Sequence, residues 1–314
     1  MMSNTASRVQ TEPDLSVDIA GVHFKNPVMA ASGTFGSGME YGEFIDLDCL
    51  GGIECKGVSA VPWEGNKAPR IAEVYGGMLN AIGLQNPGVD VFIERDLKFL
   101  SSYDTRVIAN VCGHTIEEYL RVVERLRDEK RVDLLEINVS CPNVKEGAIA
   151  FGTDPDVLRD ITRKIKNIAA QPVIMKLTPN VTSIAQMAKA AEEGGADGIS
   201  LINTITGMKI DVERGKFALA NRTGGLSGPA IHPVAVRMVY EAAHAVSIPV
   251  IGMGGIATWQ DAVEMMLAGA SAVAVGAMNF HDPHCMEKII AGMEDYAVRH
   301  KISKITEIIG AVHD

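Results

Sequence analysis

The chain has 314 residues, of which 29 are basic and 39 acidic, so its formal net charge is −10 at pH 7. Hydrophobic residues make up 47% and charged residues 22%, a balance that allows a large core and disfavours a disordered chain. The acidic excess disfavours a protein that holds a nucleic-acid backbone on a basic surface. The length allows two domains, but a single α/β barrel also reaches roughly 250 residues or more.

The N-terminal segment is polar and contains no apolar signal core, and no run approaches the roughly 18 apolar residues of a membrane helix. The 5 cysteines are odd in number and form no C-x-x-C pair, which is typical of a reduced cytosolic protein without its own zinc or iron–sulfur site. The 8 histidines show no metal-ligand spacing and are interpreted as structural. We therefore expect a cytoplasmic protein with no membrane segment and no metal, divided into a tail (1–16) and a single domain (17–314).

Eight short apolar runs alternate with amphipathic stretches along the chain. Nearly continuous apolar runs are typical of parallel strands that are buried on both faces. The strands are predicted at 27–30, 53–58, 106–111, 132–139, 172–177, 198–203, 249–252 and 272–276.

Helix signals fill the gaps between these strands. Thr115 and Glu118 form a capping-box pattern, Asp154 precedes a proline, Ser183 begins a third helix, and a fourth is predicted at 260–267. Eight β/α units predict a (β/α)8 TIM barrel. A doubly wound sheet is the alternative, but the first turn, ASGTFGSG, lacks a G-x-G-x-x-G fingerprint. Gaps of about 50 residues after the second strand and about 45 after the sixth predict insertions at the C-terminal face.

The chemistry of a barrel lies at the carboxyl ends of its strands, where several unusual residues occur. Lys56 and Lys176 lie in strand candidates, although burying an unpaired ammonium is costly. One lysine could form a Schiff base, as in an aldolase, or place positive charge beside a cofactor that becomes anionic on reduction. Cys141, between Asn138 and Asn143, could act as nucleophile or general base, or be a small buried residue.

Two further segments indicate ligand binding. The segment 80–88 is rich in amides and uncharged, which suits a neutral planar ring or, alternatively, an ordered turn. Gly254-Gly255 and Gly276-Ala277 follow the last two strands, where free backbone N–H groups commonly bind phosphate. The stretch 224–228 could add more amides, and the pattern does not say whether substrate or cofactor carries the phosphate.

At this point the motifs resemble a known family. The chain is similar to class 1 dihydroorotate dehydrogenases over about residues 17–310, on the motifs NPVMAASGTFG, CKGVS, NAIGLQNPG, INVSCPNVKEGAIAFG, MKLTPN, NTITGM, GGLSGPAIHPVA, IGMGGI and VGAMNF. EGAIAFG and NAIGLQNPG resemble the class 1B catalytic subunit more than the fumarate-using class 1A.

The resemblance implies an FMN-binding barrel that oxidises dihydroorotate to orotate in pyrimidine synthesis. Cys141 would be the base that takes the proton from C5, while a hydride leaves C6 for the flavin. Lys56 would touch both FMN and substrate, and Lys176 would lie beside the flavin edge that becomes negative. A partner subunit with FAD and a [2Fe–2S] cluster would pass electrons to NAD, in an A2B2 heterotetramer around a homodimer core.

The resemblance also implies two sets of binding residues and a lid at 141–153 over the substrate. The substrate set is Lys56, Asn80, Ala81, Ile82, Gly83, Leu84, Asn138, Asn143, Asn203 and Thr204. The FMN set is Ser32, Lys56, Gly57, Asn110, Asn138, Lys176, Ile202, Gly228, Gly254, Gly255, Gly276 and Ala277. Gly57 and Ala277 depart from the family pattern, where we expect threonine or alanine at the first position and threonine at the second.

Three rival functions stay open from the residues alone. One is another flavin barrel reductase of the dihydropyrimidine type. Another is a Schiff-base aldolase or a phosphosugar isomerase on the same barrel. The third is a binding module without enzymatic activity.

Overall fold

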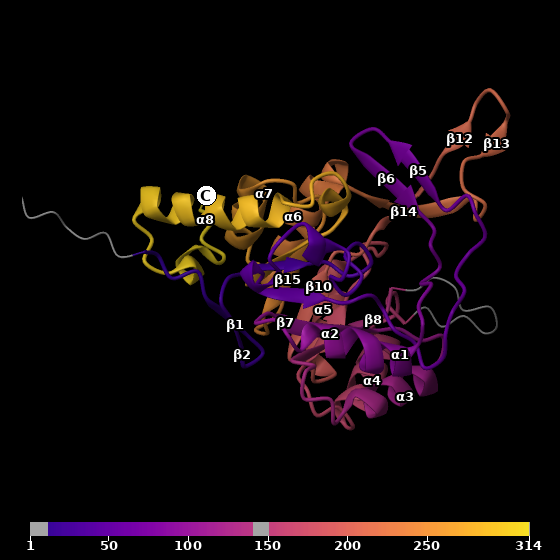
Figure 1. Ribbon diagram of the computed structural model, residues 1–314, viewed down its shortest axis with the longest axis horizontal. Helices are drawn as coiled ribbons and strands as arrows, with labels where there is room; N and C mark the ends of the chain where they lie inside the picture. The colour runs from indigo at the N-terminus through magenta and orange to yellow at the C-terminus, as the bar shows by residue number, and fades with distance from the viewer. Residues whose placement is uncertain (1–11, 141–150, 314) are drawn as a thin grey trace, which may run out of the picture.

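The computed structural model describes residues 12–140 and 151–313. Eight parallel strands close into a barrel with helices around it, which confirms the predicted TIM-barrel fold (Figure 1). Almost every residue of these eight barrel strands is buried, because the interior of the barrel and the helices cover both faces of the sheet. Around the barrel the strands are β3 (Val28–Ala30), β4 (Gly52–Glu54), β7 (Arg106–Val111), β8 (Leu134–Asn138), β9 (Val173–Lys176), β10 (Gly198–Leu201), β15 (Val250–Met253) and β16 (Ala272–Val275).

Amphipathic helices bury one face against the outside of the barrel. The main ones are α3 (Ile116–Leu126), α4 (Pro155–Lys166), α5 (Ile184–Glu193), α6 (His232–Ala243), α7 (Trp259–Leu267) and α8 (Cys285–His300). A broken helix is made of α1 (Val89–Val91), the π-helical η3 (Phe92–Leu97) and α2 (Lys98–Leu100). Short 3-10 turns are η1 (Tyr41–Glu43), η2 (Leu47–Cys49), η4 (Pro229–Ile231), η5 (Ala277–Phe280) and η6 (Ile305–Ile308). None of the helices in the described ranges is long and apolar enough to cross a bilayer.

The helix caps largely follow the sequence. The side chains of Asp154 and Ser183 accept backbone N–H bonds at the starts of α4 and α5, as their patterns predict. At α3 the predicted capping box is only half formed, because the Glu118 carboxylate accepts from the N–H of His114 instead of that of Thr115. A complete box occurs at α7, between Thr258 and Asp261.

The chain enters the barrel through an antiparallel hairpin, β1 (Val17–Ile19) and β2 (Val22–Phe24). The N–H of Asp14 donates to the carbonyl of Ser303 at 2.9 Å, so the two described ends of the chain lie together.

The two long insertions pair with each other. β5 (Ile71–Val74) and β6 (Gly77–Asn80) join β11 (Ile205–Met208) and β14 (Thr223–Ser227) in a sheet of order β11-β14-β6-β5. A two-stranded hairpin, β12 (Ile210–Asp211) and β13 (Lys216–Phe217), stands out beyond this sheet (Figure 1). A Cβ at Gly225 would lie 2.0 Å from Thr204 Oγ1, so only glycine allows this close approach.

The second barrel strand is shorter than predicted. It ends at Glu54, so the prediction that Lys56 lies inside a strand is wrong. Beyond Glu54 the N–H of Lys56 donates to the carbonyl of Gly36 at 2.8 Å, in the loop after β3, while the N–H groups of Cys55 and Val58 still donate to β7. Lys56 therefore lies past the end of the strand, in the cavity wall, whereas Glu54 is buried inside the barrel.

Candidate active site

A cavity of about 600 Å³ lies between the carboxyl ends of the barrel strands and the four-stranded sheet. Its volume falls in the range of roughly 300–1,000 Å³ that is typical of small-molecule and cofactor sites. Among the described residues that line it, Lys56 and Lys176 are the two charged side chains, and many of the others are amides, hydroxyls and glycines. A wall with two cations and no carboxylate suits an anionic ligand.

Lys176 lies in the floor of the cavity at the end of β9, and its side chain is 5% exposed. Its Nζ lies 3.1 Å from Glu136 Oε2 on β8 and 3.3 Å from Glu54 Oε2 on β4. Ser32 Oγ accepts a further bond from this ammonium at 3.2 Å. Burial alone would lower the pKa of Lys176, but attraction to Glu136 and Glu54 outweighs it and raises that pKa.

The two carboxylates below Lys176 differ in their hydrogen bonding. Glu136 also accepts from Ser200 Oγ at 2.6 Å and from the side-chain amide of Asn110. Glu54 is fully buried, and its Oε1 has no hydrogen-bond partner among the described residues. Burial, followed by repulsion from Glu136, raises the pKa of Glu54 to about 7.

Lys56 lies on another part of the cavity wall, half-buried, two residues beyond β4. No carboxylate in the described part of the chain lies within ion-pair distance of its ammonium. Burial lowers the pKa of Lys56, and nearby Arg70 lowers it further, while Cys112 opposes them. The two predicted lysines therefore share one cavity but have opposite electrostatic surroundings.

Glycines form one end of the cavity. Gly228, Gly254, Gly255, Gly276 and Ala277 all line it. Gly254 and Gly255 have φ values of +126° and +72°, a left-handed region that strains any other residue. A Cβ at Gly254 would also lie 2.7 Å from that of Ala235. This glycine cradle at the exits of β15 and β16 has the composition and position of a barrel phosphate site.

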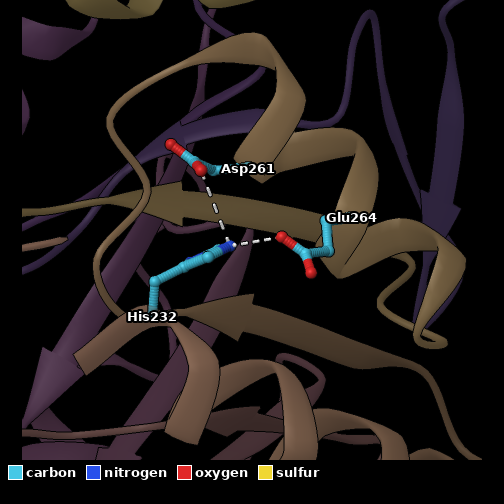
Figure 2. A group of neighbouring side chains, drawn as sticks. All are labelled: His232, Asp261 and Glu264. Atoms are coloured by element: carbon cyan, nitrogen blue, oxygen red, sulfur yellow. Dashed lines mark hydrogen bonds and ion pairs between the residues drawn. The ribbon is translucent and has the colours of Figure 1, made fainter. Parts of the chain in front are cut away.

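A histidine and two carboxylates lie behind this cradle. Figure 2 shows His232 of α6 with Nε2 directed at Asp261 and Glu264 of α7, at 3.8 and 3.2 Å. Its Nδ1 donates to the carbonyl of Gly254 at 3.0 Å, and a Cβ on Gly255 would lie only 2.8 Å from the Cβ of His232. The three side chains are close enough to share a metal ion. Both ring nitrogens already have protein partners, so the arrangement is explained by support of the glycine cradle.

Amide side chains gather on a third part of the wall. Asn138 Oδ1 accepts from Asn203 Nδ2 at 3.3 Å and from the N–H of Ser140 at 3.2 Å. Its amide nitrogen has no hydrogen-bond partner within the described ranges, so it can donate to a ligand. The amide nitrogen of Asn180 donates to the Thr204 carbonyl at 3.1 Å. Asn80 comes from the opposite side, where β6 pairs with β14. These amides can orient a planar ring that carries both donors and acceptors.

Every sequence-predicted site residue within the described ranges lines this one cavity. They are Ser32, Lys56, Gly57, Asn80, Ala81, Ile82, Gly83, Leu84, Asn110, Asn138, Lys176, Ile202, Asn203, Thr204, Gly228, Gly254, Gly255, Gly276 and Ala277. Cys141, Asn143 and most of the predicted lid at 141–153 lie outside the described residues. The departure at Gly57 has a local reason, since a Cβ there would lie 2.6 Å from Asn110 Oδ1.

Sequence reasoning missed several residues of the site. Glu54 and Glu136 each lie in an apolar strand run, two residues before a lysine and an asparagine, respectively. A single acidic residue inside such a run was the available signal. Asn180 ends the motif MKLTPN but received no role, although it positions Thr204. His232 was interpreted as structural, and its contact with Gly254 gives that structural role a place beside the site.

The comparisons with known proteins agree with this geometry. The family model for dihydroorotate dehydrogenase matches residues 14–296. The chain is 63% identical over 297 residues to the dihydroorotate dehydrogenase B (NAD(+)) catalytic subunit of Lachnoclostridium phytofermentans, covering 95% of this chain and 99% of that protein. It is 58% identical over 302 residues to the protein of the same name from Alkaliphilus metalliredigens, covering 96% and 100%.

A solved structure shows the same fold. The DHODH of Eimeria tenella, in complex with ferulenol, matches with a TM-score of 0.80 at 23% identity and covers 97% of this chain and 90% of that one. At this level of identity the similarity concerns the barrel and not the details of the site.

Proposed function

The chain belongs to the dihydroorotate dehydrogenase family, and we propose that it is the catalytic subunit of a class B enzyme. It oxidises dihydroorotate to orotate in pyrimidine biosynthesis, with FMN in this chain and NAD as the final electron acceptor. The observation that carries the proposal is the division of one cavity into a glycine cradle, a floor cation and a cluster of amides. These three parts match a phosphate group, a redox ring and a planar substrate.

The residues present fit FMN. Gly254 and Gly255 line the cavity and must be glycine, because a Cβ on either would clash with Ala235 or His232. Their place at the exit of β15 suits a phosphate bound by backbone N–H groups. Lys176 lies in the floor, and Asn110 offers an acceptor, Oδ1, that has no partner among the described residues. Bound FMN would supply hydride acceptance from C6 of the substrate, with negative charge developing on its ring. Lys176 would stabilise that charge, because its ammonium is fixed in place before the reaction.

The chain's own residues would hold and deprotonate the substrate. Dihydroorotate is an anion, and Lys56 provides the second cation on a wall whose described residues include no carboxylate. Asn80, Asn138 and Asn203 would hydrogen-bond the edges of its ring. Cys141 would take the C5 proton at Sγ, an assignment that rests on the sequence NVSCPN.

The relatives support an electron-transfer partner, since both carry the name of a B-class catalytic subunit linked to NAD(+). We propose that the partner carries FAD and a [2Fe–2S] cluster and forms an A2B2 assembly around a homodimer of this chain. The described cysteines, Cys49, Cys55, Cys112 and Cys285, form no disulfide, and all but Cys49 are buried. A cluster on a separate subunit is consistent with this distribution.

Anaerobic reduction is the decisive experiment. The purified chain should be yellow, and dihydroorotate should bleach its flavin absorbance without oxygen. Turnover with NAD should appear only when the partner is co-expressed, whereas fumarate should not support turnover. Flavin that stays oxidised in the presence of dihydroorotate would contradict the proposal.

One observation favours a second function. The lowered pKa of Lys56 is a property that a Schiff-base lysine requires. If the protein is a colourless aldolase, borohydride should trap a carbonyl substrate on Lys56. The absence of such an adduct on the yellow protein would exclude this alternative.

A further inference from the structure

Three ionisable groups form a buried cluster directly below the cavity. Glu54 is 0%, Glu136 1% and Lys176 4% exposed. The single ammonium lies within 3.3 Å of both carboxylates. If all three groups were ionised, the cluster would carry one negative charge without a compensating cation.

The contacts show which carboxylate is less able to hold that charge. Glu136 receives hydrogen bonds from Ser200 and Asn110 in addition to Lys176. Glu54 Oε2 receives weaker bonds, at 3.3 Å, from Lys176 and from the N–H of Ser32. Glu54 Oε1 has no partner in the described structure. A buried carboxylate oxygen without a donor is costly when charged, so Glu54 is the group that binds a proton.

We propose that Glu54 is a redox-linked proton acceptor. It binds a proton when negative charge arrives in the cavity beside Lys176, and it releases that proton when the charge leaves. The inference rests on the proposed function, because the oxidation of dihydroorotate is what brings the charge. Glu54 does not touch the cavity, so it is a positioning residue that acts through Lys176.

The ammonium of Lys176 links Glu54 to the cavity electrostatically. Lys176 faces the cavity on one side and the two carboxylates on the other. A new negative charge above Lys176 disfavours the ionised form of every nearby acid. The charged groups that face Glu54 are Lys176 from β9 and Glu136 from β8, while Ser32, after β3, is neutral. The pKa of Glu54, raised to about 7, means that a modest added charge is enough to change its protonation at neutral pH.

The protons and electrons balance over one turnover. A hydride leaves C6 and a proton leaves C5, and Cys141 passes the C5 proton to solvent. One proton from solvent forms an O–H bond on Glu54 as negative charge arrives above Lys176. When two electrons leave for the partner, the hydrogen that came with the hydride is released to solvent as a proton, and the O–H bond on Glu54 breaks and releases its proton to solvent as well. The buried groups and the cavity together therefore keep one negative charge throughout, with no additional reactant.

The test is the pH dependence of the bound flavin's midpoint potential, measured spectroelectrochemically on the intact protein. Above about pH 7, the slope for the natural protein should correspond to one more proton per electron pair than the slope for Glu54→Gln. Difference infrared spectra should show a protonated carboxyl band that appears on reduction and is missing in Glu54→Gln. Asp96→Asn is the matched control, because Asp96 is a buried carboxylate (4% exposed) that pairs with Arg95 away from the cavity.

Each outcome of these measurements either supports or contradicts the proposed role of Glu54. Equal slopes in the natural protein and Glu54→Gln, with flavin bound to both, would overturn the proton role and leave the proposed function intact. A natural protein that binds no flavin would overturn the proposed function itself. If Glu54→Gln does not fold, the natural protein alone still decides, because a slope of one proton per electron pair above about pH 7 contradicts the inference.

Discussion

Lys56 and Lys176 are the same residue type on the wall of one cavity, yet the protein treats them in opposite ways. Lys176 ends a buried strand and is held by two carboxylates, so its pKa is raised. Lys56 follows a strand that has already ended, lacks a carboxylate partner within the described structure, and has a lowered pKa. A fixed cation suits a charge that develops at one place, whereas an unpaired one can follow a ligand that arrives and leaves.

The comparison predicts that Lys176→Met is the more harmful change for stability. It leaves Glu54 and Glu136 buried without their cation, and breaking a buried ion pair typically costs about 3–5 kcal/mol. Lys56→Met is the matched control, which should change the free energy of unfolding by less than about 1 kcal/mol, because Lys56 forms no ion pair in the described structure. Guanidinium unfolding of both variants near pH 8 measures the difference, and equal losses would refute the contrast.

Turnover, unlike stability, should be strongly impaired in Lys56→Ala. Removal of the cation that holds the substrate should slow anaerobic flavin reduction by on the order of 10²–10³-fold, in the range seen when one electrostatic contact to a transition state is lost. Flavin content should stay close to normal, because the glycine cradle is intact. Lys67→Ala, an exposed lysine in the first insertion, is the control. A full reduction rate in Lys56→Ala would remove Lys56 from the mechanism.

The pH dependence of folding stability tests the buried carboxylates that hold Lys176. The pKa of Glu54 is about 7 in the folded protein against an ordinary value of 4.5, so the folded state keeps a proton that the unfolded chain has lost. Stability contributed by Glu54 is therefore present below about pH 4.5 and falls as pH rises to about 7. In Glu54→Gln this loss should disappear, so its stability relative to the natural protein should rise by on the order of 1–3 kcal/mol between about pH 5 and pH 8.

The measurement uses the flavin-free protein, so that it reports only on folding. Parallel unfolding curves for the two proteins at every pH would show that Glu54 ionises normally. The experiment is independent of turnover, and it tests the buried cluster even if the assigned reaction were wrong.

The barrel could be predicted because buried parallel strands leave a local signal. The predicted runs 106–111 and 272–276, for example, correspond to β7 and β16 within one residue. Lys56 was placed inside a strand because CKGVS continues an apolar run, and no local pattern shows that the strand ends at Glu54. The cavity roof depends on β6 pairing with β14, and such distant pairing is set by the closed barrel and not by any short pattern.

The candidate site also has a part that the sequence predicts and a part that it does not. Glycines with strained backbone and amides at strand ends were recognisable, and those in the described ranges line one cavity. The carboxylates beneath Lys176 were not recognised, because the identity of a strand residue does not show whether its side chain points into the barrel. Cys141 and Asn143 remain predictions from the sequence alone.

Gly57 links the two lysine regions. It follows Lys56, and a Cβ on it would lie 2.6 Å from Oδ1 of Asn110, whose amide nitrogen donates to Glu136. Gly57→Ala should therefore push Asn110 away from Glu136 and cost about 1–3 kcal/mol, as overpacking does. Combination with Asn110→Ala should cost less than the sum of the two single changes, because the second removes the atom that the new methyl group meets. Strictly additive costs in this double-mutant cycle would mean that the two lysine regions are independent, and that the network below Lys176 does not reach the rim where Lys56 lies.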